Sequence, residues 1–249
     1  MTQPLTLITG ASGGMATALG LLLHAQGHQL ILVSRHPENI HLALQTQHTV
    51  IQQDISRAGA AEDIFTQCVA TLGRVPHNLA HLAGSILLAP LHRTRDADYH
   101  MALNANLHST FYTTRAFINA LLEHKQSGSI ALVSSVAARI GIANHEVIAM
   151  VKGAIEGLVR SLAATYSSKG IRINAIAPGL MRSPANEGLF INAAAEKTIT
   201  AQYPLGRYGQ CSDGAHALAW LLSEQATWVT GQILPVDGGF SAVRPLVKG

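Results

Sequence analysis

Strand-like and helix-like segments alternate along this chain, and the alternation limits its possible folds more than any other feature. Short apolar runs typical of buried strands occupy residues 5–9, 29–34, 48–52, 78–82, 129–134, 171–176 and 232–236. Segments with apolar residues at helical spacing occupy residues 15–26, 62–72, 98–124, 146–167 and 213–222. Strands separated by helices predict an α/β fold, a doubly wound parallel sheet of about seven strands with helices on both faces.

The length and composition predict a single domain. A chain of 249 residues, 48% of them hydrophobic, suits one α/β domain spanning residues 1–249 better than two small ones. Residues 180–210 have the least regular pattern, with Pro184, Pro204 and several glycines, and we expect them to form a mobile lid over a substrate. Charged residues make up only 12% of the chain, so we expect a second subunit to cover part of the surface.

Composition also argues against several classes of function. The net charge of +3 comes without any run of Lys or Arg, which argues against nucleic-acid binding. No apolar stretch is long enough to span a bilayer, and residues 1–4 lack the basic segment of a secretory signal. Cys68 and Cys211 lack metal-ligand spacing, and two free thiols in a reducing cytosol are favoured over one disulfide. We therefore expect a cytoplasmic protein that holds no metal and binds no membrane.

A glycine-rich turn joins the first predicted strand to the first predicted helix. Glycines let the backbone approach a pyrophosphate closely, and the N-terminus of the helix supplies oriented N–H donors. Such a cluster can be only a turn, but its place after an N-terminal strand favours a dinucleotide site. The predicted contact residues of this turn are Gly10, Ser12, Gly13, Gly14 and Met15. The third glycine of the usual fingerprint is replaced by Ala16, which adds one methyl group.

The end of the second predicted strand indicates which dinucleotide would bind. A site specific for NAD carries a carboxylate there, which binds the ribose 2′-hydroxyl. This chain has Ser34 and Arg35 instead, and an arginine can pair with a 2′-phosphate. We therefore expect a preference for NADP(H) over NAD(H); the alternative is that Arg35 is only a solvated residue at the strand end. Asp54, after the third strand, is expected to meet the adenine edge or to cap the following segment.

Further motifs follow in order along the chain. They are Ala83-Gly84, Asn106-Leu107, Ser134-Ser135, Lys152, Asn174 with Pro178-Gly179, and the Val-Asp-Gly-Gly run at residues 236–239. Together with the glycine turn and Asp54, their joint spacing, from about residue 5 to about residue 240, resembles the short-chain dehydrogenase/reductase family in its single-domain form. The resemblance implies a Rossmann-type fold and an oxidoreductase. It also implies cofactor contacts from Ala83, Gly84, Pro178, Gly179 and Ser183.

The same resemblance implies an active site made of Asn, Ser, Tyr and Lys. In the family the Tyr transfers the proton, the Lys lowers the pKa of that Tyr and holds the nicotinamide ribose, the Ser orients the substrate oxygen, and the Asn anchors a water. Asn106, Ser135 and Lys152 match this set. The tyrosine position, four residues before Lys152, is Ile148, and residues 113–165 contain no tyrosine.

Three smaller departures from the family pattern accompany the missing tyrosine. The Asn-Asn-Ala-Gly segment of the family reads His81-Leu82-Ala83-Gly84 here. The glycine that follows the Asn motif is Ser109, and the third glycine of the turn is Ala16, as noted above.

An isoleucine has no ionisable proton, so Ile148 cannot be a general acid or base. The loss of a positioned general acid costs about 10²- to 10⁴-fold in rate. His145 precedes Ile148 by three residues, and in the resembled fold its loop lines the substrate pocket, where an imidazole could donate the proton. Glu146 beside it would orient the imidazole or support the helix N-terminus. The alternative is that His145 is an ordinary surface residue.

The retained site residues also have structural alternatives. Lys152 can bind ribose hydroxyls without taking part in catalysis. Ser135 can cap a turn at the end of a strand, and Asn106 can brace a helix kink. Ser183 can serve as the N-cap of the segment that follows it.

The leading hypothesis is an NADP(H)-binding oxidoreductase for a small, apolar carbonyl or alcohol, in which His145 or an ordered water replaces the tyrosine. Ile148 supports a second hypothesis, a catalytically inactive NADP(H)-binding sensor or scaffold subunit. A dehydration or isomerisation on the same scaffold is a third. The resemblance also implies a homo-oligomer, a dimer or a tetramer, in which the two long helices pair. Ala149, Gly153 and Gly157 suit a close approach of helices.

Overall fold

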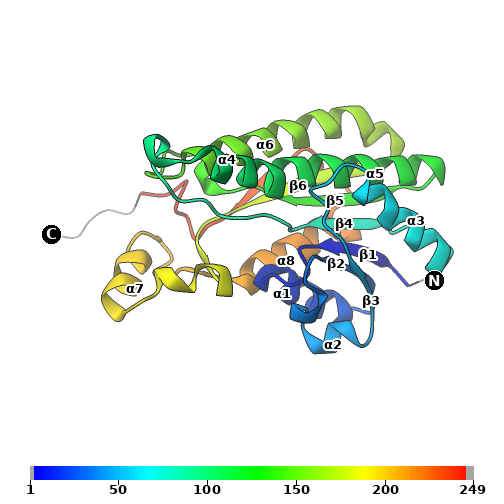
Figure 1. Ribbon diagram of the computed structural model, residues 1–249, viewed down its shortest axis with the longest axis horizontal. Helices are drawn as coiled ribbons and strands as arrows, with labels where there is room; N and C mark the ends of the chain where they lie inside the picture. The colour runs from blue at the N-terminus through cyan, green and yellow to red at the C-terminus, as the bar shows by residue number, and fades with distance from the viewer. Residues whose placement is uncertain (1–2, 245–249) are drawn as a thin grey trace.

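The computed structural model describes residues 3–244, in which a seven-stranded sheet lies between two layers of helices (Figure 1). The strands are β1 (Leu5–Thr9), β2 (Gln29–Ser34), β3 (Thr49–Gln52), β4 (Asn78–His81), β5 (Gly128–Val133), β6 (Ile171–Pro178) and β9 (Ile233–Val236). They pair in the order β3-β2-β1-β4-β5-β6-β9, and every pair is parallel. The predicted fold class, a Rossmann-type doubly wound sheet, is confirmed.

Helices cover both faces of this sheet. One face carries α1 (Gly14–Ala25), α2 (Leu42–Gln45) and α8 (Cys211–Leu222). The other carries α3 (Ala60–Leu72), α4 (Asp96–Ala102), α5 (Ser109–Glu123) and α6 (Glu146–Tyr166). Each strand boundary lies within two residues of its predicted position, because continuous apolar runs of this length suit strands that are buried on both faces.

Alternate residues of the central strands belong to two separate hydrophobic cores, one on each face of the sheet. Leu7 of β1 packs with α3, α5 and α6, whereas the next residue, Ile8, packs with α1 and α8. Ile31 and Leu32 of β2 divide in the same way. Side chains of a strand point alternately to opposite faces, so a strand between two helical layers must be apolar at every position. This two-sided burial holds the carboxyl ends of β1, β4, β5 and β6 in one plane.

The single long helix predicted over residues 98–124 is wrong in one respect. A π-helical turn, Leu103–His108, separates α4 from α5. Within it, the side-chain amide of Asn106 donates to the carbonyl oxygen of Ala102 at 3.0 Å. A π turn accommodates one extra residue and is often found at functional sites. The deviation bulges the helix where Asn106 reaches towards the loop after β4.

The segment 180–210 is more regular than predicted. β7 (Met181–Arg182) pairs in parallel with β8 (Gly209–Gln210), and between them lie the 3₁₀ helix η6 (Pro184–Leu189) and α7 (Ala193–Thr200). Asn192 caps α7, since its side-chain oxygen accepts from the amide of Ala195 at 2.9 Å. Helix α7 buries none of its side chains, so it lacks the apolar stripe by which a sequence reveals a helix. In Figure 1 this segment projects away from the sheet.

Two further findings limit the kinds of site in the described chain. Within residues 3–244, every helix is too short or too polar to cross a membrane. The same residues contain no group of three or more His, Cys, Asp or Glu side chains that could hold a metal ion. The ends of the predicted domain, residues 1–2 and 245–249, lie outside the described residues.

Candidate active site

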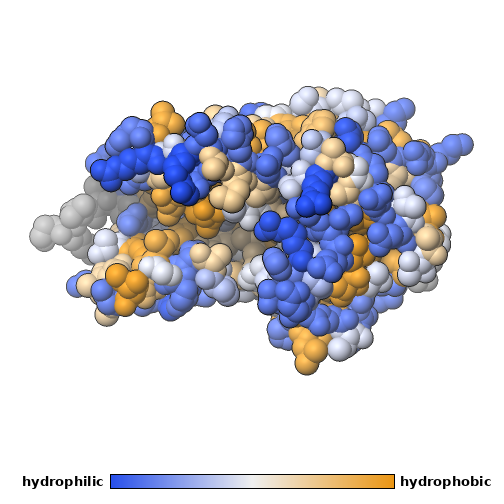
Figure 2. Space-filling model, viewed as in Figure 1, coloured by the Kyte–Doolittle hydropathy of each residue, from blue (hydrophilic) through white to orange (hydrophobic). Residues whose placement is uncertain are grey.

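The predicted site residues gather at the carboxyl ends of the strands. In the strand order, β1 has β2 on one side and β4 on the other, so the chain changes direction across the sheet beside β1. Ligands of open α/β sheets bind in the crevice outside such a switch point. Figure 2 shows a hollow between the projecting part that contains α7 and the part above it, with hydrophobic side chains in its walls.

The glycine turn has the geometry of a phosphate cradle. Gly10 has φ +65°, and a Cβ added there would lie 2.7 Å from the backbone nitrogen of Ala83. Gly13 is the N-cap of α1, so no side chain occupies the first N–H groups of that helix. A Cβ at Gly14 would lie 2.9 Å from the Sγ of Cys211. The turn therefore excludes side chains at Gly10 and Gly14 and leaves backbone donors for an anion.

The residues that flank the turn pack against α1 and α8. Met15 is the second residue of α1, and its sulfur lies 2.9 Å from the position that a Cβ on Gly214 would take. Ala16 is 2% exposed and belongs to the core shared by α1 and α8. The methyl group that replaces the third glycine is therefore accommodated by packing, as expected.

The end of β2 lies beside the glycine turn. The hydroxyl of Ser34 donates to that of Ser12 at 3.1 Å and accepts from the amide of His36 at 3.0 Å. Ser34 is buried, whereas Ser12 and Arg35 are exposed. Two segments that are 22 residues apart thus meet through two hydroxyls, and the exposed Arg35 follows directly after Ser34.

Asp54 is held within its own loop. Its Oδ1 accepts from both the amide and the hydroxyl of Ser56, at 3.1 and 2.7 Å. Although burial alone would raise it, the hydrogen bonds from Ser56, with Arg35 and Arg57 nearby, hold the pKa of this carboxyl below its usual value. The N-cap of α3 is Gly59, so Asp54 does not cap that helix. A role at the adenine edge stays a prediction.

Asn106 joins the π turn to the loop that follows β4. Its side-chain nitrogen donates to the carbonyl oxygen of Ser85 at 3.1 Å, and its Oδ1 accepts from the amide of Ser85 at 3.4 Å. A Cβ added at Gly84 would lie 2.7 Å from Oδ1, so only glycine fits there. Asn106 therefore has the bracing contacts named as its alternative role, and these contacts shape the backbone at residues 83–85.

Lys152 lies in the same place. It is a buried residue of α6, and its Nζ donates to the carbonyl oxygen of Val133, the last residue of β5, at 3.0 Å. Burial lowers the pKa of this ammonium to about 8. The same hypothetical Cβ at Gly84 would be 3.7 Å from Nζ. Lys152, Asn106 and Gly84 therefore converge, as the motif spacing predicts.

Ser135 follows β5 and begins the 3₁₀ turn η4 (Val136–Ala138). Its hydroxyl oxygen accepts from the amide of Ala137 at 3.2 Å, which is the turn-capping contact given as its alternative role. Because a hydroxyl also has a proton to donate, this contact leaves Ser135 able to bind a substrate oxygen.

Ile148 and His145 lie on the first turn of α6. Ile148 is 5% exposed, so an apolar side chain fills the position one turn before Lys152. His145 is the N-cap residue, and its Nδ1 lies 2.7 Å from the carbonyl oxygen of Ala143. A carbonyl can only accept, so Nδ1 carries the hydrogen and Nε2 remains for other partners. Asn144 adopts φ +62°, and its carbonyl accepts from Ala89 at 3.0 Å.

Pro178 and Gly179 lie where β6 leads into the segment 180–210. Gly179 donates to Val236 at 3.1 Å, and a Cβ there would meet Tyr203 and Asp237 at 3.0 to 3.2 Å. Ser183 is the N-cap residue of η6. Its amide donates to the Oδ1 of Asn186 at 2.8 Å, so Ser183 occupies the N-cap position that was its alternative without a capping bond from its own hydroxyl.

His81, which departs from the family pattern, is buried near Lys152, and sequence reasoning missed its contacts. The Nδ1 of His81 lies 3.0 Å from the hydroxyl of Thr9, and its Nε2 lies 3.3 Å from that of Ser109. Burial, with a smaller effect of the nearby Lys152 charge, lowers the pKa of His81 to about 3. One signal in the sequence could have revealed this contact, because His81 and Ser109 both depart from the family pattern. In the structure these two residues contact each other.

Sequence reasoning also missed Glu156. This carboxylate lies four residues after Lys152 on α6 and is only 8% exposed. Acidic residues are rarely buried without a partner, and the partners here are Ser134 and Arg139. The apolar spacing of α6 places position 156 towards the core, and this was the signal that could have revealed it.

Comparisons with known proteins agree with this geometry. A family model described as Enoyl-(Acyl carrier protein) reductase matches residues 10–241. Carbonyl reductase family member 4 of Danio rerio is 33% identical over 239 residues, which cover 94% of this chain and 97% of that protein.

Two solved structures extend the similarity to the whole fold. One, with bound NADP, is from Agrobacterium tumefaciens and is named as a candidate 2-deoxy-d-gluconate 3-dehydrogenase; it is 31% identical, covers 96% of this chain and 97% of its own, and has a TM-score of 0.86. The other is 4-hydroxyisoleucine dehydrogenase complexed with NADH, 25% identical, covering 97% of this chain and 100% of its own, with a TM-score of 0.90.

Proposed function

The chain belongs to the short-chain dehydrogenase/reductase family, and we propose that it is an NADP(H)-dependent oxidoreductase for a small, apolar carbonyl or alcohol. The observation that carries this proposal is the convergence of Lys152 and Asn106 on Gly84, beside the glycine turn. One of the similar structures holds NADP and the other NADH, so the choice between the two cofactors rests on this chain's own residues. The pair of Ser12 and Ser34, with Arg35 after it, supports NADP(H).

The residues present fit a nicotinamide dinucleotide. The turn at Gly10 and Gly14, where an added Cβ would collide with Ala83 or Cys211, would place backbone N–H groups for a pyrophosphate at the N-terminus of α1. Lys152 uses one of its three N–H groups on Val133, which leaves two for ribose hydroxyls. The hydroxyl of Ser183 would bind the carboxamide. When bound, the nicotinamide supplies or accepts the hydride.

The chain's own residues would then handle the substrate oxygen and its proton. The hydroxyl of Ser135 would donate to that oxygen and orient the carbonyl. We assign the proton to His145, whose Nε2 is not used by its contact with Ala143. Ile148 and Lys152 lie on one face of α6, four residues apart, and His145 is the N-cap residue directly before that helix. An ordered water beside Ile148 is the alternative donor.

A cavity beside Gly179 supports a small apolar substrate. Its volume is about 300 Å³, at the lower end of the range for ligand pockets. Apolar lining residues are Leu180, Met181, Tyr203, Leu205, Pro235 and Val236. Its charged members are Arg207, Asp213 and Asp237, of which Arg207 and Asp213 pair with one another at 2.6 Å. The predicted lid, residues 180–210, contributes much of this wall.

The test measures hydride transfer from NADPH to a panel of apolar ketones and aldehydes. The loss of NADPH absorbance serves as the readout. We expect slow turnover, reduced about 10²-fold or more in Ser135→Ala and in His145→Ala. His216→Ala is the matched control, since His216 makes the same kind of contact, Nδ1 to the carbonyl oxygen of Ser212 at 2.7 Å, at an exposed position of α8. Turnover that persists unchanged in His145→Ala would assign the proton to water.

Ile148 favours a second candidate, an NADP(H)-binding protein without catalysis. The buried isoleucine leaves the retained Lys152 with a binding role alone. Under this hypothesis NADPH binds saturably, and the wild-type chain shows no hydride transfer with any carbonyl in the panel.

We further propose that the chain forms a symmetric homo-oligomer in the cytoplasm. An apolar groove between α5 and α6 supports this assembly; it is lined by Leu107, His108, Phe111, Tyr112, Ala154, Gly157, Leu158 and Ser161. A Cβ at Gly153 or Gly157 would contact nothing within the protomer, so another helix can approach there. The free thiols of Cys68 and Cys211 suit a reducing compartment. Light scattering of the wild-type chain and of Gly157→Glu tests the assembly: a dimer or tetramer should become smaller in the variant.

A further inference from the structure

A buried carboxylate on α6 holds the residue that precedes Ser135. The hydroxyl of Ser134 donates to the Oε1 of Glu156 at 3.0 Å and lies 3.4 Å from the carbonyl oxygen of Lys152. Ser134 is 1% exposed, and its amide donates to Ile176 of β6 at 2.8 Å. The chain at Ser134 is therefore bound on both sides, by β6 and by α6.

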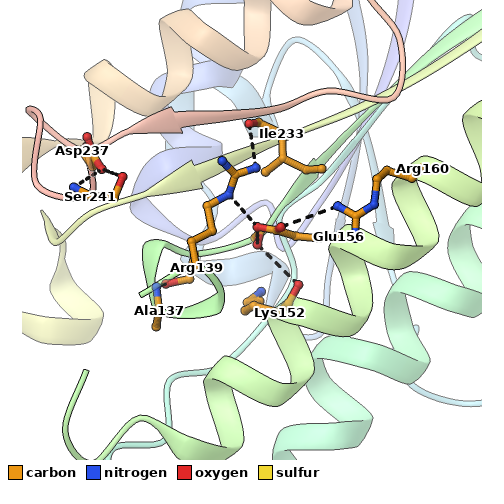
Figure 3. Close-up of polar contacts among 10 residues, drawn as sticks. Ala137, Arg139, Lys152, Glu156, Arg160, Ile233, Asp237 and Ser241 are labelled. Atoms are coloured by element: carbon orange, nitrogen blue, oxygen red, sulfur yellow. Dashed lines mark hydrogen bonds and ion pairs between the residues drawn. The ribbon is translucent and has the colours of Figure 1, made fainter. Parts of the chain in front are cut away.

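The same carboxylate holds the residue that ends the turn after Ser135. Arg139 follows η4, and its Nε donates to the Oε1 of Glu156 at 3.1 Å. Its Nη2 donates to the carbonyl oxygen of Ile233 in β9 at 3.0 Å. A second arginine, Arg160, approaches the Oε2 at 3.8 Å (Figure 3). One oxygen of Glu156 thus receives hydrogen bonds from both ends of the segment 134–139.

Ser135 lies inside the segment that Glu156 closes. Within itself the segment is held by one 3₁₀ turn, in which the amide of Ala137 donates to the hydroxyl of Ser135 and the amides of Ala138 and Arg139 donate to backbone carbonyls. Lys152 lies one helical turn before Glu156 on α6, and its Nζ binds Val133, two residues before Ser135. Glu156 and Lys152 thus contact the chain on either side of Ser135 from the same helix.

The energetics of such a group argue for positioning more than for stability. A buried ion pair gains little net stability, because the loss of hydration offsets the attraction between the charges. An apolar residue at position 156 would fill the core as well as the glutamate does. An apolar side chain could not, however, fasten Ser134 and Arg139 to one point. Hydrogen bonds to a charged acceptor are also stronger and more directional than neutral ones.

We propose that Glu156 is a positioning residue for Ser135, which it holds in register with Lys152 through Ser134 and Arg139. This inference rests on the proposed function, in which Ser135 orients the substrate oxygen. If Glu156 has this role, its substitution should slow the reaction of bound substrate more than it weakens the binding of the nucleotide. Substitution of an ordinary core residue has no reason to affect the two differently.

The test compares Glu156→Gln with the wild-type chain. Glutamine keeps the size, and its amide oxygen can still accept from Ser134 and Arg139, but it carries no charge and can no longer form ion pairs with Arg139 and Arg160. We expect kcat for carbonyl reduction to fall about 10-fold or more, with the KM for NADPH within about twofold, because small misplacements of reacting groups cost rate. Glu123→Gln, on the exposed end of α5, is the matched control and should leave both constants unchanged. A Glu156→Gln variant that melts earlier but keeps its kcat would show a merely structural role and overturn the proposal.

A second readout does not depend on activity. Hydrogen exchange of the peptide covering residues 134–140 should be faster in Glu156→Gln and in Arg139→Gln, while the exchange of β1 stays unchanged. In the double variant, the exchange of this peptide should be no faster than in either single variant, since the two residues act as a unit. If the wild-type chain shows no turnover, the proposed function fails, and the exchange data still decide whether Glu156 holds the turn. Unchanged exchange in both single variants would overturn the inference.

Discussion

The Nζ of Lys152 donates to the carbonyl oxygen of Val133 at 3.0 Å, which ties the middle of α6 to the last residue of β5. The bond holds the ammonium in a buried position, 3.7 Å from where a Cβ on Gly84 would lie. Burial lowers its pKa to about 8, so the charge of this lysine depends on pH in the range where enzymes are assayed.

Nucleotide affinity should therefore fall as pH rises through about 8. Below that value Lys152 is an ammonium that donates to ribose hydroxyls, and above it the charge is lost. Lys152→Met should weaken NADPH binding by roughly 10-fold or more at pH 7, since a charged hydrogen bond contributes about 1.5–3 kcal/mol, and should remove the pH dependence. Fluorescence titration with NADPH from pH 6.5 to 9 measures both. The exposed Lys169→Met is the control, and equal pH profiles for the two variants would contradict the assignment.

Arg35→Ala should reduce the preference for NADPH over NADH. The guanidinium would lose its pairing with the 2′-phosphate, whereas the binding of NADH involves no such group. We expect NADPH affinity to drop about 10- to 100-fold, the equivalent of about 1.5–3 kcal/mol, with NADH affinity unchanged. Arg93→Ala, an exposed arginine outside the turn, should change neither. A parallel loss of both affinities in Arg35→Ala would count against an NADP(H) site.

Ile148→Tyr should accelerate carbonyl reduction by about 10²- to 10⁴-fold, the usual contribution of a positioned general acid. Ile148→Phe is the matched control, because it adds the same ring without the hydroxyl. Both rings overfill the site occupied by isoleucine, at a cost of about 1–3 kcal/mol in the free energy of unfolding, which thermal melting should show for both. If the tyrosine variant is no faster than the phenylalanine variant, the pocket has lost its catalytic geometry, and the binding-only hypothesis gains.

Gly10→Ala should damage both stability and nucleotide binding. Its φ of +65° costs an L-residue about 1–2 kcal/mol, and the added methyl would also lie 2.7 Å from the backbone of Ala83. We expect a lower melting temperature together with loss of saturable NADPH binding. Gly141→Ala is the comparison, since a Cβ there meets nothing within 4 Å, and it should leave both measurements unchanged.

His81 should make the free energy of unfolding fall with acid. Its folded-state pKa is about 3, below its usual value of 6.5, so the folded chain binds fewer protons than the unfolded chain between these values. The stabilising contribution of the neutral ring is thus complete above pH 6.5 and is lost as pH falls towards 3, by up to about 1.4 kcal/mol per pH unit. Between pH 7 and pH 4.5, the free energy of unfolding should fall by about 2–3 kcal/mol less in His81→Asn than in the wild-type chain. Urea unfolding at the two pH values measures this difference. Parallel pH profiles would mean that the pKa of His81 is the same in the folded and unfolded chains.

Several of these residues could be found from the sequence because their roles are encoded locally. A glycine turn after a strand needs only its neighbours to be recognised, and so does the spacing from Ile148 to Lys152. The π turn at Asn106 could not be found in this way, since it depends on contacts with Ser85, 21 residues away. Helix α7 was missed because none of its side chains is buried, which leaves no apolar period to detect.

The sequence by itself determined the order of strands and helices, the cofactor turn and the absence of a tyrosine before Lys152, because each depends on residue types at short, regular spacing. Only the tertiary structure decided which distant side chains meet. Glu156 accepts a hydrogen bond from Ser134, 22 residues away, and Arg139 donates to Ile233, 94 residues away. His81 meets Thr9 across 72 residues. Such contacts depend on how the helices pack against the sheet, and packing has no period that can be seen along the chain.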